Sequence, residues 1–218
     1  MIEPFGIDEC WLDVTGSIRI FGSGEEIAEK IRSSIKNELK ITVSIGVSFN
    51  KVFAKLGSDM KKPDGITVIS KENFKSKVWP LPAKDLLYVG RSTEERLKSS
   101  GIFTIGDVAN CETALLSHLL GKNGEQLKRY AMGLDSSPVA DSDASRIPKS
   151  IGRSVTLDHD ITSFEEVHKI FLILSEEIIE KMRKTELSAF GFQIHLRDTS
   201  LRVKEYSATL STPITSSV

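Results

Sequence analysis

The chain has 218 residues, of which 39% are hydrophobic and 27% charged, and its formal net charge is -1. This composition excludes a wholly disordered chain and a protein that is basic overall, and no apolar run approaches the roughly 18 residues of a membrane span. The start lacks the pattern of a secretory signal, and Cys10 and Cys111 stand alone. We therefore expect a reducing, cytoplasmic setting without a disulfide framework or a zinc site.

The first 80 residues alternate between extended and helical patterns. We expect, in chain order, extended segments at 4–8 and 11–15, a helix at 23–36, a buried strand at 41–48, a helix at 50–60 and a strand at 66–69. Ser23 and Glu26 fit a capping box at the start of the first helix. This order predicts an α+β fold with helices on one face of a sheet.

The composition changes near residue 80. We expect short helices without strands at 80–134, a polar linker at 135–149, an extended segment at 150–157, a long amphipathic helix at 163–184, and a hairpin of strands at 188–197 and 201–210. The chain is therefore predicted to contain a mixed first domain, a small helical domain and a second α/β domain.

Two adjacent acids, Asp8 and Glu9, stand at the end of the first extended segment. Neighbouring strand residues point to opposite faces, so both carboxylates reach one site only if the backbone turns there. A divalent cation removes the repulsion between clustered carboxylates, and Mg²⁺ held by carboxylates and substrate phosphates is typical of phosphoryl transfer. An exposed acidic turn or a helix cap is the alternative interpretation.

Lysines are concentrated in residues 41–62, which carry four lysines and one acid. Lys51 and Lys55 share a helix face, which suits a nucleic-acid backbone, and Lys62 at the helix end suits a triphosphate. The alternative is an ordinary solvated face with lysine favoured at a helix C-terminus.

A glycine turn joins two short helices at residues 88–97. Ser92 and Glu95 fit a capping box there, and backbone N–H groups in such a turn suit a phosphate oxygen. An ordinary corner between two helices is the alternative.

Four segments together, in order and spacing, resemble the Y-family DNA polymerases of the DNA polymerase IV and UV-protection type over nearly the whole chain. They are Gly6–Thr15, Ser44–Lys55 with Lys62–Gly65, Gly101–Val108 and Lys149–Arg153. The resemblance implies a partial palm at 1–79 with a ferredoxin-like sheet, a helix-hairpin-helix thumb at 80–134, a linker at 135–149 and a partial little finger at 150–218.

The resemblance also implies roles for residues. Asp8 and Glu9 match the second and third metal-binding carboxylates, and Lys62 matches a triphosphate contact. The expected DNA contacts are Lys51, Lys55, Val89, Gly90, Arg91, Arg153, Arg197, Arg202 and Lys204, of which the last three rest on no motif. The implied activity is low-fidelity, template-directed synthesis past damaged bases with two Mg²⁺ ions in the intact parent. The implied partners are primer-template DNA, dNTP and a sliding clamp, with no membrane.

The chain departs from the family pattern in two ways. Tyr88 stands where the thumb turn usually has glycine. Nothing before Asp8 matches the first metal-binding Asp or the fingers, and the little finger stops after two strands. We therefore expect a fragment that binds metal weakly or not at all and is inactive alone. A non-catalytic module that grips duplex DNA, and a nucleotide cyclase with a palm-like sheet, are the competing hypotheses.

Overall fold

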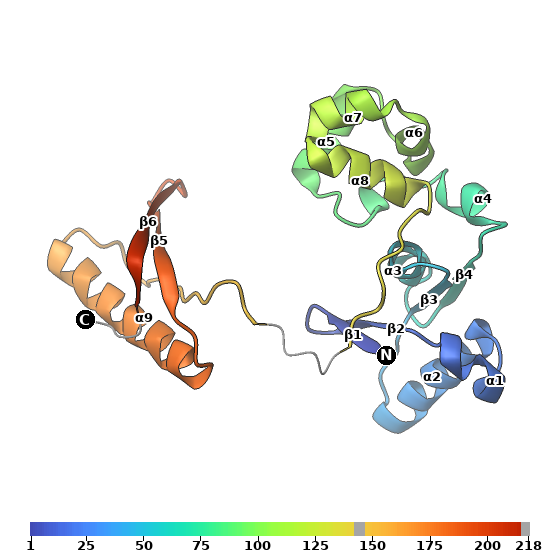
Figure 1. Cartoon of the computed structure of the whole chain (residues 1–218), viewed down its shortest axis with the longest axis horizontal. Coiled ribbons are helices and arrows are strands. Elements are labelled where there is room, and N and C mark those ends of the chain that lie inside the picture. The colour runs from blue at the N-terminus through green and yellow to red at the C-terminus, as the bar shows by residue number, and fades with distance from the viewer. Residues whose placement is uncertain (142–146, 215–218) are drawn as a thin grey trace. The chain divides into compact units, whose positions relative to one another are not determined.

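The computed structural model describes residues 1–141 and 147–214. The chain divides into two compact units, residues 1–145 and residues 146–218 (Figure 1). Both units combine helices with strands, which confirms the α+β class predicted from the sequence.

The first unit begins with a mixed part and continues with a helical part. Its strands are β1 (Ile2–Phe5), β2 (Glu9–Leu12), β3 (Ile45–Ser48) and β4 (Ile66–Ile69). Its helices are α1 (Ile18–Phe21), α2 (Gly24–Leu39), α3 (Lys51–Met60), α4 (Phe74–Val78), α5 (Arg91–Ser99), α6 (Ile105–Asn110), α7 (Thr113–Leu120) and α8 (Lys122–Ala131), with 3₁₀ turns at Thr15–Ser17 and Ala83–Asp85.

The strands of the first unit form two separate ladders. β1 pairs antiparallel with β2, and β3 pairs parallel with β4, with no hydrogen-bonded ladder joining the two pairs in the described residues. The expectation of one continuous sheet is therefore corrected, because each four-residue strand is paired along one edge only. The strand expected at 41–48 is also shorter, since Ile41 lies 56% exposed and only residues 45–48 find a partner.

Local sequence signals place α2 and α3 as expected. Ser23 and Glu26 form the predicted capping box, and the Asn50 side chain accepts a hydrogen bond from the Phe53 backbone at the start of α3. Glycine at position 46 lets α3 lie directly on β3, because a Cβ atom there would come within 1.9 Å of the Ala54 carbonyl oxygen.

The core of the first unit joins α3 and β4 to the helical part. Phe53 is fully buried and packs against the rings of Phe49 and Phe74. The same cluster continues through Val52, Leu56, Ile69, Val78, Leu86, Leu97, Ile105, Val108, Leu116 and Leu127. The mixed part that carries the acidic pair and the helical part that carries the glycine turn therefore share one core.

The second unit contains α9 (Phe164–Lys184), β5 (Ala189–Arg197) and β6 (Val203–Ile214). Ser163 caps α9 as a side-chain acceptor, and β5 and β6 form the expected antiparallel hairpin. The segment expected to be extended at 150–157 lies outside the helices and strands, and no ladder includes it. Within the described ranges, no helix has an apolar stretch long enough to cross a membrane.

Candidate active site

One face of the β1–β2 hairpin lies against α3. The register pairs Glu3 with Trp11 and Phe5 with Glu9, so these four side chains share a face. The rings of Phe5 and Trp11 lie 4.5 Å apart, and the Trp11 indole N–H donates to the Lys51 carbonyl oxygen at 3.0 Å. A two-stranded hairpin is marginal alone, so these contacts to α3 hold it in place.

The acidic pair lies where the hairpin turns. Asp8 is exposed in the turn and Glu9 is the half-buried first residue of β2. The backbone therefore turns at this pair, and the common site expected for the two carboxylates stays a prediction. No three His, Cys, Asp or Glu side chains in the described parts of the chain come together as a metal-binding group.

A line of alternating charges runs from the acidic pair to the predicted triphosphate contact. Lys55 Nζ lies 3.0 Å from Glu9 Oε1 and 2.8 Å from Asp59 Oδ2. Lys62 Nζ lies 2.7 Å from the other oxygen of Asp59. The structure therefore connects Glu9 to Lys62 through two intervening side chains of α3.

The pKa values of the two middle groups reflect this pairing. Burial lowers the pKa of Lys55, but its hydrogen bonds to Asp59 and Glu9 outweigh burial and hold the pKa above its ordinary value. Burial raises the pKa of Asp59, and the lysines on either side reverse that effect and lower it. Both groups are therefore charged at neutral pH.

Lys51 is turned toward the hairpin. Its Nζ lies 2.6 Å from Glu3 Oε2 and 4.5 Å from the centre of the Trp11 ring, and only 15% of its side chain is exposed. Lys51 and Lys55 share a helix face as predicted, but this face contacts carboxylates of β1 and β2. Their predicted contacts to DNA stay predictions.

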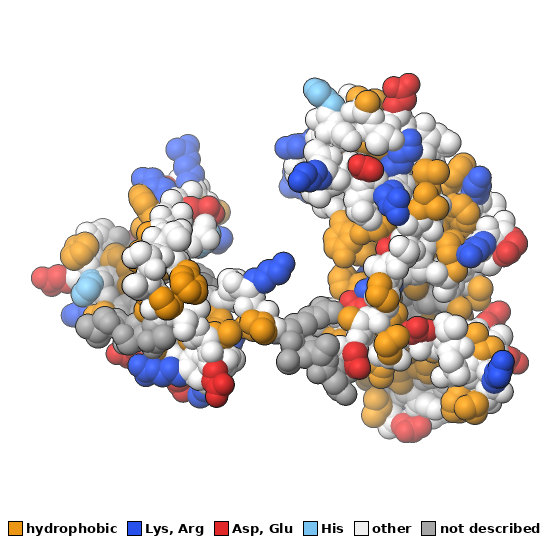
Figure 2. Space-filling model, in the orientation of Figure 1, with side chains coloured by type: hydrophobic (Ala, Val, Ile, Leu, Met, Phe, Trp, Pro, Cys, Tyr) orange, Lys and Arg blue, Asp and Glu red, His pale blue; other side chains and the backbone are white. Residues whose placement is uncertain are grey.

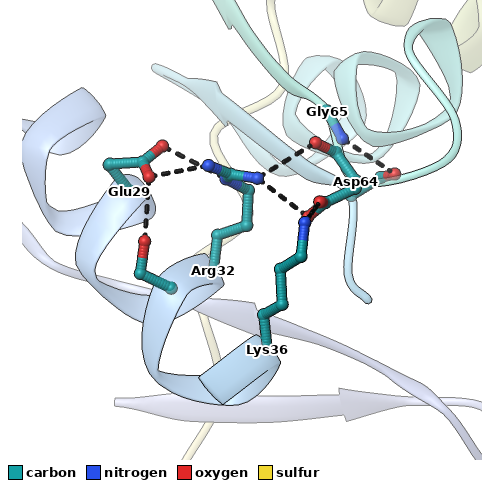
Figure 3. A network of polar contacts seen from close by, with 7 residues as sticks. Glu29, Arg32, Lys36, Asp64 and Gly65 are labelled. Atoms are coloured by element: carbon teal, nitrogen blue, oxygen red, sulfur yellow. Dashed lines mark hydrogen bonds and ion pairs between the residues drawn. The ribbon is translucent and has the colours of Figure 1, made fainter. Parts of the chain in front are cut away.

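The turn at residues 62–65 is anchored by α2 (Figure 3). Arg32 lies 2.9 Å from Asp64 Oδ1 and also bonds Glu29 on its own helix, while Lys36 pairs with Asp64 Oδ2. Asp64 adopts a left-handed backbone with φ of 60°, which its neighbours must hold in place. The anchored turn begins with Lys62, whose side chain is 55% exposed.

The charge on Asp64 should make the stability of the first unit depend on acid. Lys36 first and Arg32 second hold the Asp64 pKa below its ordinary value of 3.8. The stabilisation is therefore complete above that value and is lost as pH falls through the lower folded value. We expect Asp64→Asn to lower the urea midpoint at pH about 6 and to lower it by less and less as the pH falls below the ordinary pKa of the carboxyl group. Lys36→Met should give the same pattern, and a midpoint unchanged at pH about 6 would contradict it.

The glycine turn precedes α5. Gly90 is the exposed N-cap with no side-chain cap, and open space surrounds the position of its missing Cβ. The capping box predicted for Ser92 and Glu95 is wrong, because α5 begins at Arg91 and Glu95 instead bonds that arginine at 3.0 Å. Tyr88 adopts a left-handed backbone with φ of 71°. Glycine adopts this conformation most easily, and glycine is the residue expected at this position of the turn.

The neighbours of Gly90 differ in exposure. Val89 is half-buried against the core, whereas the Arg91 side chain is 92% exposed. Figure 2 shows Lys and Arg side chains gathered over the helical part of the first unit on the face in view.

The cations predicted in the second unit are exposed but do not form one surface. Arg153 pairs with Glu177 of α9 at 2.6 Å. The register pairs Arg197 with Val203 and Lys204 with Leu196, so Arg197 and Lys204 lie on opposite faces of the hairpin. Arg202 lies in the turn between them, and Figure 2 shows Lys and Arg side chains at this tip.

Several residues at the site were not predicted from the sequence. Glu3 and Asp59 are the charged partners of the predicted residues Lys51 and Lys62, and Arg32 pairs with Asp64 in the turn that begins at Lys62. The spacing of Asp59 from Lys55 and Lys62 was a usable local signal, because residues three and four apart on a helix are neighbours. Glu3 pairs with Lys51, which is 48 positions away, and Arg32 pairs with Asp64, which is 32 positions away. Local spacing does not reveal partners so far apart in the sequence.

Two family models match the chain. The model described as impB/mucB/samB family matches residues 1–59, and the model described as impB/mucB/samB family C-terminal domain matches residues 148–217. Together they cover more than half of the chain.

Curated relatives match across the whole chain. The chain is 50% identical to DNA polymerase IV of Acetivibrio thermocellus over 219 residues, which is 100% of this chain and 55% of that protein. It is 38% identical to DNA polymerase IV 1 of Bacillus subtilis over 216 residues, covering 98% of this chain and 51% of the relative. The chain thus spans about half the length of the curated relatives it matches.

Solved structures of Y-family polymerases also match nearly the whole chain. A Y-family DNA polymerase chimera, Dbh-Dpo4(243-245)-Dbh, matches 98% of this chain and 60% of its own with a TM-score of 0.83 and 26% identity. DinB from Sulfolobus solfataricus matches 98% of this chain and 61% of its own with a TM-score of 0.59 and 27% identity.

Proposed function

The chain belongs to the impB/mucB/samB family, and on this premise we propose that it is part of a Y-family DNA polymerase that copies past damaged bases. The proposal includes primer-template DNA and dNTP as substrates, a sliding clamp as a partner, and a cytoplasmic location. A solved ternary complex of Dbh, at 26% identity, supports the two substrates. Family membership does not support the nucleotide cyclase.

The observation that carries the proposal is the path of charges from the hairpin turn to the anchored turn. Asp8 and Glu9 lie at one end, and Lys62 lies at the other, with Lys55 and Asp59 between them. A nucleotide triphosphate needs cations along its phosphates and carboxylates that hold the metal beside them.

The two carboxylates fit part of a magnesium site. Asp8 and Glu9 offer the hard oxygen ligands that Mg²⁺ prefers, and Asp8 is exposed for binding. In the longer polymerase, two Mg²⁺ ions would neutralise charge on the leaving pyrophosphate and activate the primer hydroxyl. Lys55 orients the Glu9 carboxylate, and Asp59 holds the Lys62 ammonium beside the anchored turn until a triphosphate competes for it.

We propose that the 218-residue chain alone is inactive, because two carboxylates without the third bind metal weakly. A primer-extension assay on this chain should show no dNTP incorporation, and robust incorporation would contradict the proposal. The matched positive control is a chimera in which this chain replaces the matched 219 residues of the Acetivibrio thermocellus relative.

The chain alone should still bind duplex DNA through exposed cations. The turn around Gly90 offers backbone N–H groups, and Arg91 and Arg202 are exposed near the proposed contacts. Phosphate contacts of this kind make affinity fall with salt without reading sequence.

Arg91→Ala and Arg202→Ala should each weaken duplex binding and reduce the slope of log affinity against log salt by about 1. Fluorescence anisotropy of a labelled primer-template, titrated at several salt concentrations, measures this slope. Lys98→Ala is the control, because Lys98 lies in the last turn of α5, at the opposite end of the helix from Gly90 and Arg91. Unchanged slopes in both arginine variants would contradict the proposed contacts.

A further inference from the structure

The segment that follows α8 lies across the first unit. We call residues 133–140 the strap. At its beginning, the Asn50 side-chain amide donates to the Gly133 carbonyl oxygen at 3.1 Å. At its end, the Ala140 N–H donates to Glu3 Oε2 at 2.7 Å, and Lys51 Nζ lies 3.4 Å from the Pro138 carbonyl oxygen.

The Glu3 carboxylate joins three elements at one point. It lies on β1, pairs with Lys51 of α3, and accepts the Ala140 N–H of the strap. Glu3 is only 7% exposed, so this charge needs close partners. A hydrogen bond from a backbone N–H to a buried carboxylate is stronger than one between neutral groups.

Trp11 lies beside both members of the Glu3–Lys51 ion pair. It lies directly opposite Glu3 in the ladder, its ring faces the Lys51 ammonium, and its indole N–H bonds the Lys51 carbonyl oxygen. The hairpin face therefore holds both the backbone and the ammonium of Lys51, and Lys51 holds the Glu3 carboxylate beside the strap.

We propose that Glu3 and Lys51 form a clasp that fastens the strap to the acidic hairpin. Residues 135–140, which are part of the first unit, are then held at β1. Lys51 is a positioning residue in this account, in place of a DNA contact. The proposal goes beyond polymerase activity and stands on contacts within the first unit.

Fastening the strap places it on the same hairpin as the acidic pair. Glu3 lies on β1, opposite Trp11 on β2, and the turn between these two strands carries Asp8.

Amide hydrogen exchange of the 218-residue chain, followed by NMR, tests the clasp. The Ala140 amide should be protected in the unmodified chain. Glu3→Leu removes its acceptor, and Lys51→Met removes the counter-ion, so each should speed Ala140 exchange about tenfold or more while the β4 amides keep their rates. Lys51→Arg should restore protection to within about twofold of the unmodified chain.

Lys55→Met is the matched control. It removes the other lysine from the same face of α3, whose partners are Glu9 and Asp59, and should leave Ala140 protected. An unprotected Ala140 amide in the unmodified chain, or equal protection with and without Lys51, would overturn the clasp. Neither readout depends on DNA synthesis, so the clasp and the proposed function fail or hold separately.

Discussion

Asp8→Asn together with Glu9→Gln should lower dNTP incorporation by the chimera about 1,000-fold or more. Both substitutions keep the size of the side chain and remove its charge at the hairpin turn. A loss of this size corresponds to roughly 4 kcal/mol of transition-state stabilisation, which is typical of charge neutralisation at a phosphoryl-transfer site. Single-turnover primer extension under saturating DNA measures the rate.

Asp13→Asn is the control for this pair. Asp13 follows β2, and its carboxylate accepts the Thr15 backbone N–H at 2.9 Å, away from the hairpin turn. We expect its rate to stay within about twofold. Duplex affinity of the double variant should also be unchanged, since neither acid is proposed to contact the DNA backbone. A double variant that keeps more than a tenth of the rate would show that these carboxylates do not hold the metal.

Phe53→Ala should cost the first unit about 3–5 kcal/mol of unfolding free energy. Phe53 is fully buried on α3, and its ring stacks with Phe74 at a centroid distance of 5.5 Å. It also meets the strap, because a Cβ added to Gly133 would lie 2.9 Å from the Phe53 ring. Removing the ring leaves a cavity between the mixed and helical parts that neighbouring side chains fill only partly.

Urea unfolding followed by tryptophan fluorescence measures this loss. Both tryptophans, Trp11 and Trp79, lie in the first unit, so the signal reports that unit alone. Phe103→Ala is the matched control, since the Phe103 side chain is 57% exposed and should change stability by less than about 1 kcal/mol. A loss below about 1 kcal/mol for Phe53→Ala would contradict the shared core.

Local patterns predicted the elements whose signals lie within a few residues. Ser23 with Glu26 marked the start of α2, and the apolar spacing and Asn50 marked α3. The same kind of signal was wrong at Ser92, because the backbone at Gly90 starts α5 earlier and brings Glu95 to Arg91. Whether a cap pattern in the sequence forms a cap therefore depends on where the preceding turn ends and the helix begins.

Long-range pairing decided what the sequence did not predict. The ion pairs of Lys51 with Glu3 and of Lys55 with Glu9 were not predicted, because the two acids belong to a hairpin far away in the sequence. The single sheet expected in the first unit is two separate ladders, β1–β2 and β3–β4. The sequence of a strand does not show which other strand it pairs with. Similarly, the polar composition at 135–140 predicted a linker, and the buried Glu3 carboxylate gives that segment a partner.

Primer extension by the chimera is the decisive test of the proposed polymerase function. On a primer-template carrying a damaged base, with Mg²⁺ and all four dNTPs, the chimera should extend the primer past the lesion, and the 218-residue chain alone should not. A chimera that binds the duplex with the expected salt dependence yet incorporates no nucleotide would contradict the account and favour a non-catalytic module that grips DNA.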